Sequence, residues 1–144
     1  MSSERNVDIF SGLILVVSII AIVMEAIGPF AGFYYGGYGD RYSCLGCEYW
    51  TAGDLIAQIF ILILFIIQVV IALNNLLPKK FISIDLTKYS LYIAITTFAL
   101  AIIGLISFGT THIGDEWWPE LGFYGSVVGG FLNTILFFLK QKSK

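Results

Sequence analysis

Two cysteines and a few ionisable side chains are the residues of this chain whose types and spacing could carry chemistry. Cys44 and Cys47 are its only cysteines, and the segment between them is Leu45-Gly46. Thiols at this spacing can close a short-range disulfide or act as a redox pair. Half of a zinc site is also possible in principle, but His112 is the only histidine and cannot complete a set of four ligands. The spacing therefore predicts a disulfide, structural or redox-active, and no metal.

Glu25 is the ionisable residue placed most unusually, because it lies within a long apolar run. An acid inside a membrane span is a functional-site hypothesis by default. Pro29 follows one helical turn later, about 6 Å along a helix, so a shallow side chain that touches water is the alternative. Gln58 lies equally far inside the next apolar run. We therefore expect Glu25 and Gln58 to form a polar pair at one depth inside a bundle.

Long apolar blocks must position these residues. Hydrophobic residues make up 58% of the chain. Charged residues make up only 12%, whereas soluble domains contain about 25% charged residues. Each block is close to the roughly 20 apolar residues that a bilayer core requires. We predict an all-α membrane protein, a single four-span domain folded as an up-down-up-down bundle. The expected spans are residues 9–28, 54–77, 89–108 and 121–139, and the expected outer loops are 29–53 and 109–120. Asp54 is the expected N-cap of the second span.

Charges divide unevenly between the two ends of the predicted bundle. One end carries most of the basic residues, namely Arg5, Lys79, Lys80, Lys88, Lys140, Lys142 and Lys144. Arg41 is the only basic residue besides His112 in the outer loops. By the positive-inside rule, this asymmetry predicts a multi-pass protein of the cell membrane with both termini in the cytoplasm. The absence of a basic patch away from the membrane edge argues against nucleic-acid binding.

Every predicted span has one stripe of small and polar residues at helical spacing. The stripes comprise Ser11, Ser18, Ala21, Glu25 and Gly28; Asp54, Gln58, Phe65, Gln68, Ala72 and Asn75; Ser90, Ala94, Thr97, Ala101 and Gly104; and Gly122, Ser126, Gly129 and Asn133. Small residues let helix backbones approach closely in lipid, so the stripes should face inward. Gly125 with Gly129, and Ser126 with Gly130, should make the fourth span the tightest packer.

The first outer loop alternates aromatic residues with glycines. Aromatic residues favour strands and Gly-Gly favours a turn, which predicts a small β-hairpin. The alternative is an irregular loop whose aromatics form an interfacial belt. Trp50, Trp117 and Trp118 are expected to anchor the chain at the membrane interface.

The layout resembles two families of four-span membrane proteins. With Cys44 and Cys47 just before the second span, the chain is similar to quinone-linked disulfide-generating enzymes of the DsbB kind, which implies thiol–disulfide exchange at this pair. Its four spans, cytoplasmic termini and larger first outer loop with two cysteines resemble the claudin-like tetraspans. The segment 119–125, entering the fourth span, is similar to their glycine-rich entry. This resemblance implies a non-enzymatic protein of adhesion, barrier formation or channel assembly.

Three functional hypotheses follow. The first is a non-enzymatic structural or accessory subunit of a larger membrane assembly, whose outer loops make the contacts and which needs no cofactor. Its partners would be the lipid bilayer and other membrane subunits or further copies of itself. The alternative is a membrane thiol–disulfide oxidoreductase that uses Cys44 and Cys47. The third is a small ion or proton pathway at Glu25.

Overall fold

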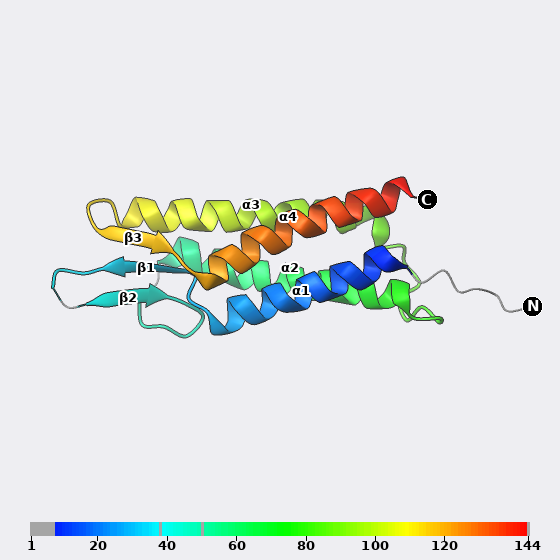
Figure 1. Ribbon diagram of the computed structural model, residues 1–144, viewed down its shortest axis with the longest axis horizontal. Helices are drawn as coiled ribbons and strands as arrows, with labels where there is room; N and C mark the ends of the chain where they lie inside the picture. The colour runs from blue at the N-terminus through cyan, green and yellow to red at the C-terminus, as the bar shows by residue number, and fades with distance from the viewer. Residues whose placement is uncertain (1–7, 38, 50, 144) are drawn as a thin grey trace, which may run out of the picture.

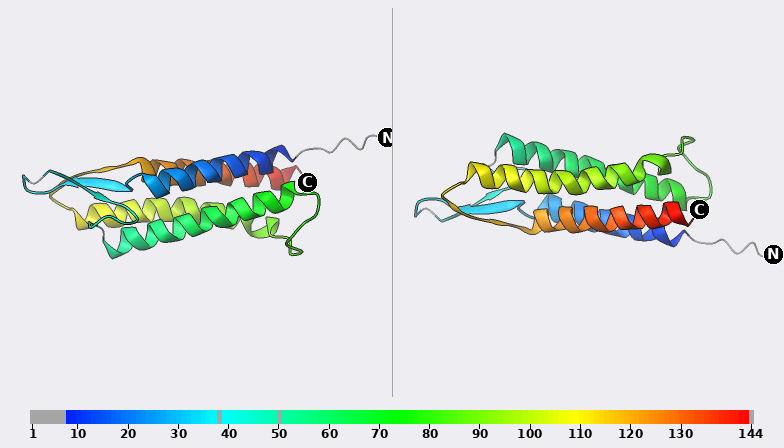
Figure 2. Two further views of the ribbon diagram at one scale, coloured as in Figure 1. Left: turned by 90° about the horizontal axis from the view of Figure 1, so that it is seen from below. Right: turned by 90° about the horizontal axis from the view of Figure 1, so that it is seen from above.

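The computed structural model describes residues 8–37, 39–49 and 51–143. It contains four long helices, α1 (Ile9–Ile27), α2 (Ala52–Leu76), α3 (Thr87–Thr111) and α4 (Leu121–Lys142). They lie antiparallel, with α1 and α3 each packed between α2 and α4 (Figures 1 and 2). All four are long and apolar enough to cross a membrane. The predicted four-helix architecture is confirmed, and each helix begins and ends close to its expected bounds.

Local capping explains where the first two helices begin. Asp8 caps α1 by accepting a hydrogen bond from the backbone N–H of Ser11 at 3.1 Å. For α2 the prediction of Asp54 as N-cap is wrong, because Thr51 occupies that position. Asp54 lies one turn inside the helix and accepts from the N–H of Thr51 at 2.7 Å. A carboxylate that reaches back in this way starts a helix upstream of itself.

A three-stranded sheet, which we call the cap, extends one end of the bundle. Its strands are β1 (Ala31–Tyr34), β2 (Asp40–Ser43) and β3 (Glu116–Pro119), in the antiparallel order β2-β1-β3. The predicted hairpin corresponds to β1 and β2. The third strand comes from the second outer loop and was not predicted. Its four residues show no alternating pattern, and they form a strand because α3 and α4 hold them beside the free edge of β1.

Glycine–tryptophan contacts fasten the cap. A Cβ on Gly32 of β1 would lie 2.8 Å from the indole of Trp118, and one on Gly109 of α3 would lie 2.5 Å from Trp117. Each indole therefore covers a bare stretch of backbone. Phe30, directly before β1, is fully buried, and its ring packs edge-on against Phe123 of α4. The cap is thus packed onto the bundle instead of hanging from it.

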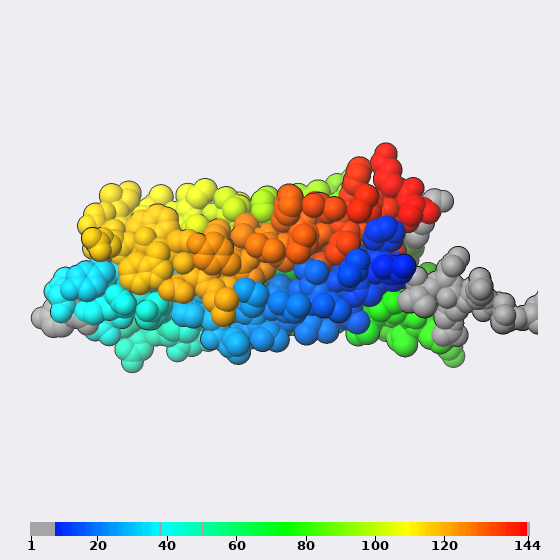
Figure 3. Space-filling view, viewed as in Figure 1, coloured from blue at the N-terminus to red at the C-terminus, as the bar shows by residue number. Residues whose placement is uncertain are grey.

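The helices bury their small and polar stripes and expose many of their Ile, Leu, Val and Phe side chains. All the stripe residues are buried except Asn75, which is half-buried, so the predicted inward faces are confirmed. Asn74, its neighbour, is buried instead and accepts hydrogen bonds from the N–H groups of Phe81 and Ile82 at 3.0 Å. The space-filling view shows α1 and α4 packed along their length, with the cap at one end (Figure 3). Both described chain ends lie at the opposite end, the terminal end (Figure 1).

Candidate functional site

Polar side chains of α1 and α4 meet at three levels inside the bundle. From the terminal end toward the cap, the pairs are Ser11 with Lys140, Ser18 with Asn133, and Glu25 with Ser126. We call this set the polar ladder. All six side chains are buried. Successive pairs follow at heptad spacing on both helices, which places them about 10.5 Å apart.

The middle level of the ladder joins all four helices. The Nδ2 group of Asn133 donates to Ser18 Oγ and to Gln68 Oε1, both at 2.8 Å. Gln68 Nε2 donates in turn to Thr97 Oγ1 at 2.9 Å, and Thr97 Oγ1 donates to the carbonyl of Ile93 at 2.8 Å. Because a shift of any one helix would break at least one of these bonds, this level fixes the alignment of the bundle.

Glu25 and Gln58 do not form the direct pair expected from the sequence. Among the described residues, Glu25 Oε2 takes Ser126 Oγ as its partner, and Glu25 Oε1 is buried with none. Gln58 Nε2 donates to Ser43 Oγ of the cap at 3.0 Å. Ser126 Oγ also lies 2.7 Å from the carbonyl of Gly122. A serine has one hydroxyl hydrogen, so a proton on Glu25 would satisfy both contacts of Ser126 at once.

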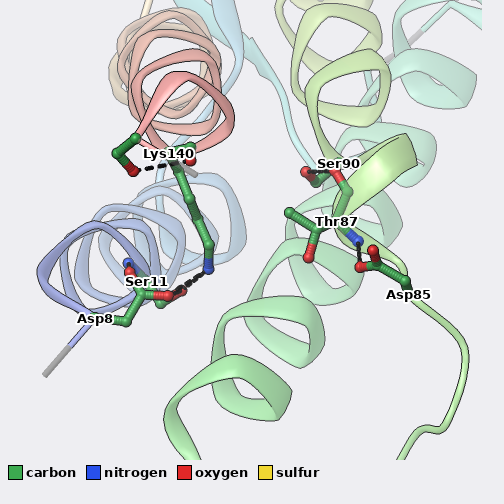
Figure 4. Close-up of polar contacts among 7 residues, drawn as sticks. Asp8, Ser11, Asp85, Thr87, Ser90 and Lys140 are labelled. Atoms are coloured by element: carbon green, nitrogen blue, oxygen red, sulfur yellow. Dashed lines mark hydrogen bonds and ion pairs between the residues drawn. The ribbon is translucent and has the colours of Figure 1, made fainter. Parts of the chain in front are cut away.

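A charged cluster closes the terminal end of the ladder. Lys140 extends from α4 to Asp8 and Ser11 at the start of α1, and it is 4% exposed (Figure 4). Burial raises the pKa of Asp8, but hydrogen bonds from Lys140 and Ser11 and the charge of Lys140 outweigh this effect, so the pKa lies below its ordinary value. Across the bundle, Asp85 Oδ1 accepts a hydrogen bond at 3.1 Å from the N–H of Thr87, the first residue of α3.

A second polar cluster joins the cap to α2. Asp54 accepts hydrogen bonds from Ser43 Oγ of β2 and from Thr51. Ser43, Asp54 and Gln58 are all buried. The carboxylate of Asp54 therefore serves two purposes, starting a helix and holding a strand.

Apolar side chains separate the levels of the polar ladder. Ile14 and Phe137, both fully buried, lie between the first level and the second in their helices. Between the second and third, a Cβ on Gly129 would lie 2.8 Å from Cβ of Ala21 and 3.0 Å from the ring of Phe65. A gap of about 10.5 Å filled by packed hydrocarbon is too long for direct proton transfer. In the described part of the chain, the ladder is thus a set of isolated contacts and not a continuous polar route.

Cys44 and Cys47 form a disulfide in a tight turn directly after β2, with their Cα atoms 5.1 Å apart. The N–H groups of Gly46 and Cys47 both point to the carbonyl of Cys44, at 2.8 and 3.2 Å. Gly46 has φ +142°, which favours glycine at this position. The bridge begins one residue after Ser43, the residue that ties β2 to Asp54. Whether its role is structural or redox stays a prediction.

The glycines singled out in α4 lie at its contacts with α1 and α3. A Cβ on Gly125 would lie 2.6 Å from Cβ of Met24 in α1, and one on Gly130 would lie 2.9 Å from the backbone of Phe98 in α3. Gly129 and Ser126 face α1 at Ala21 and Glu25. The fourth helix therefore approaches both neighbours through residues without bulky side chains.

Two of the tryptophans expected at the membrane interface, Trp117 and Trp118, pack against other parts of the protein. Trp118 covers Gly32 and donates from Nε1 to Glu120 at 2.6 Å. Trp117 packs on Gly109 and remains 38% exposed. Trp50 lies outside the described residues. A contact of these side chains with lipid stays a prediction.

An aromatic pocket of about 410 Å³ opens beside the cap, lined by Phe33, Tyr35, Tyr49, Thr111, His112 and Asp115. The rings of Phe33 and His112 stack with their centroids 3.9 Å apart. Nδ1 of His112 lies 3.3 Å from Asp115 Oδ2. Within the residues that the structure describes, no group of three or more His, Cys, Asp or Glu side chains could hold a metal ion.

Sequence reasoning missed Ser43, Lys140 and the pocket. Ser43 and the pocket depend on strand pairing and on the fold of two separate loops, which leave no local pattern. Lys140 did carry a signal, because it continues the heptad spacing of Ser126 and Asn133. Comparison of the chain with protein-family models, curated proteins and solved structures finds no match.

Proposed function

We propose that the protein is a multi-pass integral membrane protein with both termini in the cytoplasm and the cap outside. Four apolar helices with exposed hydrocarbon side chains support insertion. The described lysines at or near the terminal end support the orientation, because basic residues are retained on the cytoplasmic side. They are Lys79, Lys80, Lys88, Lys140 and Lys142.

Within that membrane we propose a non-catalytic role, as a structural or accessory subunit that contacts its partner through the cap. The observation that carries this proposal is the construction of the cap, a sheet built from both outer loops and packed onto the helix ends. The cap and the loops that adjoin it present exposed aromatic side chains, namely Tyr34, Tyr35, Tyr49 and Trp117. Large aromatic side chains on a preorganised support are typical of protein contact surfaces.

The polar interior supports the same reading. A pore needs a continuous polar lining. In the described residues, buried apolar side chains separate the levels of the polar ladder, and the polar side chains of the middle level hydrogen-bond to one another across helices. Interhelical bonds of this kind stabilise a bundle. The resemblance to the non-enzymatic claudin-like tetraspans points to the same class of function.

Site-specific photo-crosslinking in native membranes tests the proposal. A photoreactive residue replaces Tyr34 at the tip of the cap, and matched probes replace Ile103 on the exposed face of α3 and Ser83 at the terminal end. We expect a discrete protein adduct from position 34 that excess unlabelled protein competes away. Adducts of equal yield from all three positions, or none from position 34, would contradict a contact role for the cap.

A further inference from the structure

The aromatic pocket beside the cap combines three features that point to one class of ligand. Two tyrosine rings lie nearly perpendicular to Phe33: Tyr35 at a centroid distance of 6.5 Å and 84°, and Tyr49 at 6.3 Å and 73°. Phe33 is itself buried against these rings, so the exposed rings of Tyr35 and Tyr49 supply most of the aromatic wall that a ligand can reach. A carboxylate, Asp115, lies in the wall. Rings at such angles beside an acid are typical of sites for organic cations.

The net negative charge around the pocket also favours a cationic ligand. The outer loops contain five carboxylates, namely Asp40, Glu48, Asp115, Glu116 and Glu120. They oppose one arginine, Arg41, and the histidine in the pocket wall. Arg41 already lies over the ring of Tyr49, with Cζ 4.7 Å from the centroid. One face of this tyrosine therefore holds a cation within the protein itself.

The hydrogen-bonding groups of the pocket separate a quaternary ammonium from a lysine-like amine. A primary ammonium has three N–H donors that need acceptors, whereas a quaternary ammonium has none. Asp115 is already engaged with His112, and the hydroxyl of Thr111 donates to the carbonyl of Ser107 at 3.0 Å. One carboxylate oxygen of Asp115 and the hydroxyl hydrogen of Thr111 are therefore already engaged, and most of the remaining wall is aromatic ring.

From these observations we propose that the aromatic pocket binds a quaternary ammonium group between Phe33, Tyr35 and Tyr49, with Asp115 as its counter-charge. The group can come from a free cation or from a choline lipid headgroup, since the pocket opens beside the helix ends. This assignment is independent of the contact role proposed above, because it requires no protein partner.

The test is a ligand-observed NMR titration of the full chain in nanodiscs of phosphatidylglycerol, with choline as the probe. The matched control is 3,3-dimethyl-1-butanol, a neutral molecule of the same shape. We expect choline to bind about tenfold more tightly than the neutral analogue, because only the cation gains from the ring faces. Equal affinity, or no binding of choline, overturns the proposal.

Substitutions of pocket residues test whether choline binds at this site. Tyr35→Leu, Tyr49→Leu and Asp115→Asn should each weaken choline binding several-fold. Tyr34→Leu is the control, because this neighbouring tyrosine is exposed but does not line the pocket. Circular dichroism of each variant monitors folding. Weakening by Tyr34→Leu as large as that by Tyr35→Leu overturns the assignment.

Phosphatidylcholine nanodiscs distinguish the two sources. Choline binding that disappears in these discs assigns the lipid headgroup as the occupant. Binding that persists unchanged assigns a free cation. Either result supports the proposal only if the neutral analogue binds more weakly than choline in the phosphatidylglycerol nanodiscs.

Discussion

Asn133 of α4 donates hydrogen bonds to two other helices, to Ser18 of α1 and to Gln68 of α2. We expect Asn133→Leu to remove both bonds from Nδ2 and to leave Ser18 Oγ and Gln68 Oε1 without that donor. The free energy of unfolding should fall by about 1–2 kcal/mol. Reversible unfolding in mixed micelles measures it, with Leu132→Ala on the exposed face as control. An Asn133→Leu variant as stable as the wild type would contradict this role.

Glu25 is expected to tolerate an amide. In Glu25→Gln the new Nε2 group can donate to Ser126 Oγ, whose hydrogen then points to Gly122. The free energy of unfolding of Glu25→Gln should therefore be close to that of the wild type. In Glu25→Leu it should fall by about 0.6 kcal/mol or somewhat more. The same micelle assay compares the two. Loss of a transport activity in Glu25→Gln at normal stability would favour the ion-pathway hypothesis instead.

Asp8 should make stability depend on pH. Its pKa is lowered in the folded state, so its contribution is complete above the ordinary carboxylate value of about 4 and is lost as the pH falls through the lower folded value. Thermal unfolding of the wild type from pH 7 to pH 2 should show this loss. The Asp8→Asn variant should be less stable at pH 7 and should lose less on acidification. An equal loss of stability on acidification in both proteins would show that titratable groups other than Asp8 cause the pH dependence.

At the scale of the helices, close approach of α1 and α4 depends on glycine. Gly129→Ala places a Cβ 2.8 Å from that of Ala21, so the helices must separate. We expect a loss of about 1–3 kcal/mol of unfolding free energy. Gly12→Ala is the matched control, because nothing lies within 4 Å of its Cβ position. Equal changes in unfolding free energy for the two substitutions would show that helix propensity, and not helix packing, determines the effect of Gly129→Ala.

The segment between β2 and α2 provides a test of the disulfide. The double variant Cys44→Ser, Cys47→Ser should fold and insert normally but be cleaved faster by protease within residues 44–51. Reduction of a quinone by the wild type with a thiol substrate, or a mixed disulfide with another protein, would establish the oxidoreductase alternative.

How far the sequence predicts the fold differs between helices and cap. Heptad repetition of Ser11, Ser18 and Glu25 marks an inward face without any knowledge of partners, because helical spacing is a local property. The partner of Glu25 is not local. Ser126 and Gln58 both lie on inward stripes at the expected depth, and only the packing of α1 against α4 selects Ser126. Likewise β3 is a strand because of where its neighbours hold it.

For the molecule as a whole, the arrangement in the membrane is testable by labelling. Single cysteines at Lys80, Asp115 and Ser143 are exposed to an impermeant maleimide in intact cells, in the Cys44→Ser, Cys47→Ser background. Asp115→Cys should react, and Lys80→Cys and Ser143→Cys should react only after permeabilisation. Reaction of Lys80→Cys in intact cells would reverse the proposed orientation.

The junction between α1 and β1 also determines where this chain can change length during evolution. Gly28 and Pro29 are packed against the start of α4, and Phe30 begins the pairing with Ser43 and Glu120. One inserted residue there would turn Gly32 away from Trp118 and exchange the two faces of β1. The turn at Gly36–Gly37 has open space around it and tolerates added residues. Relatives of this protein should therefore vary in length at the tip of the cap and stay constant in length from residue 9 to residue 34.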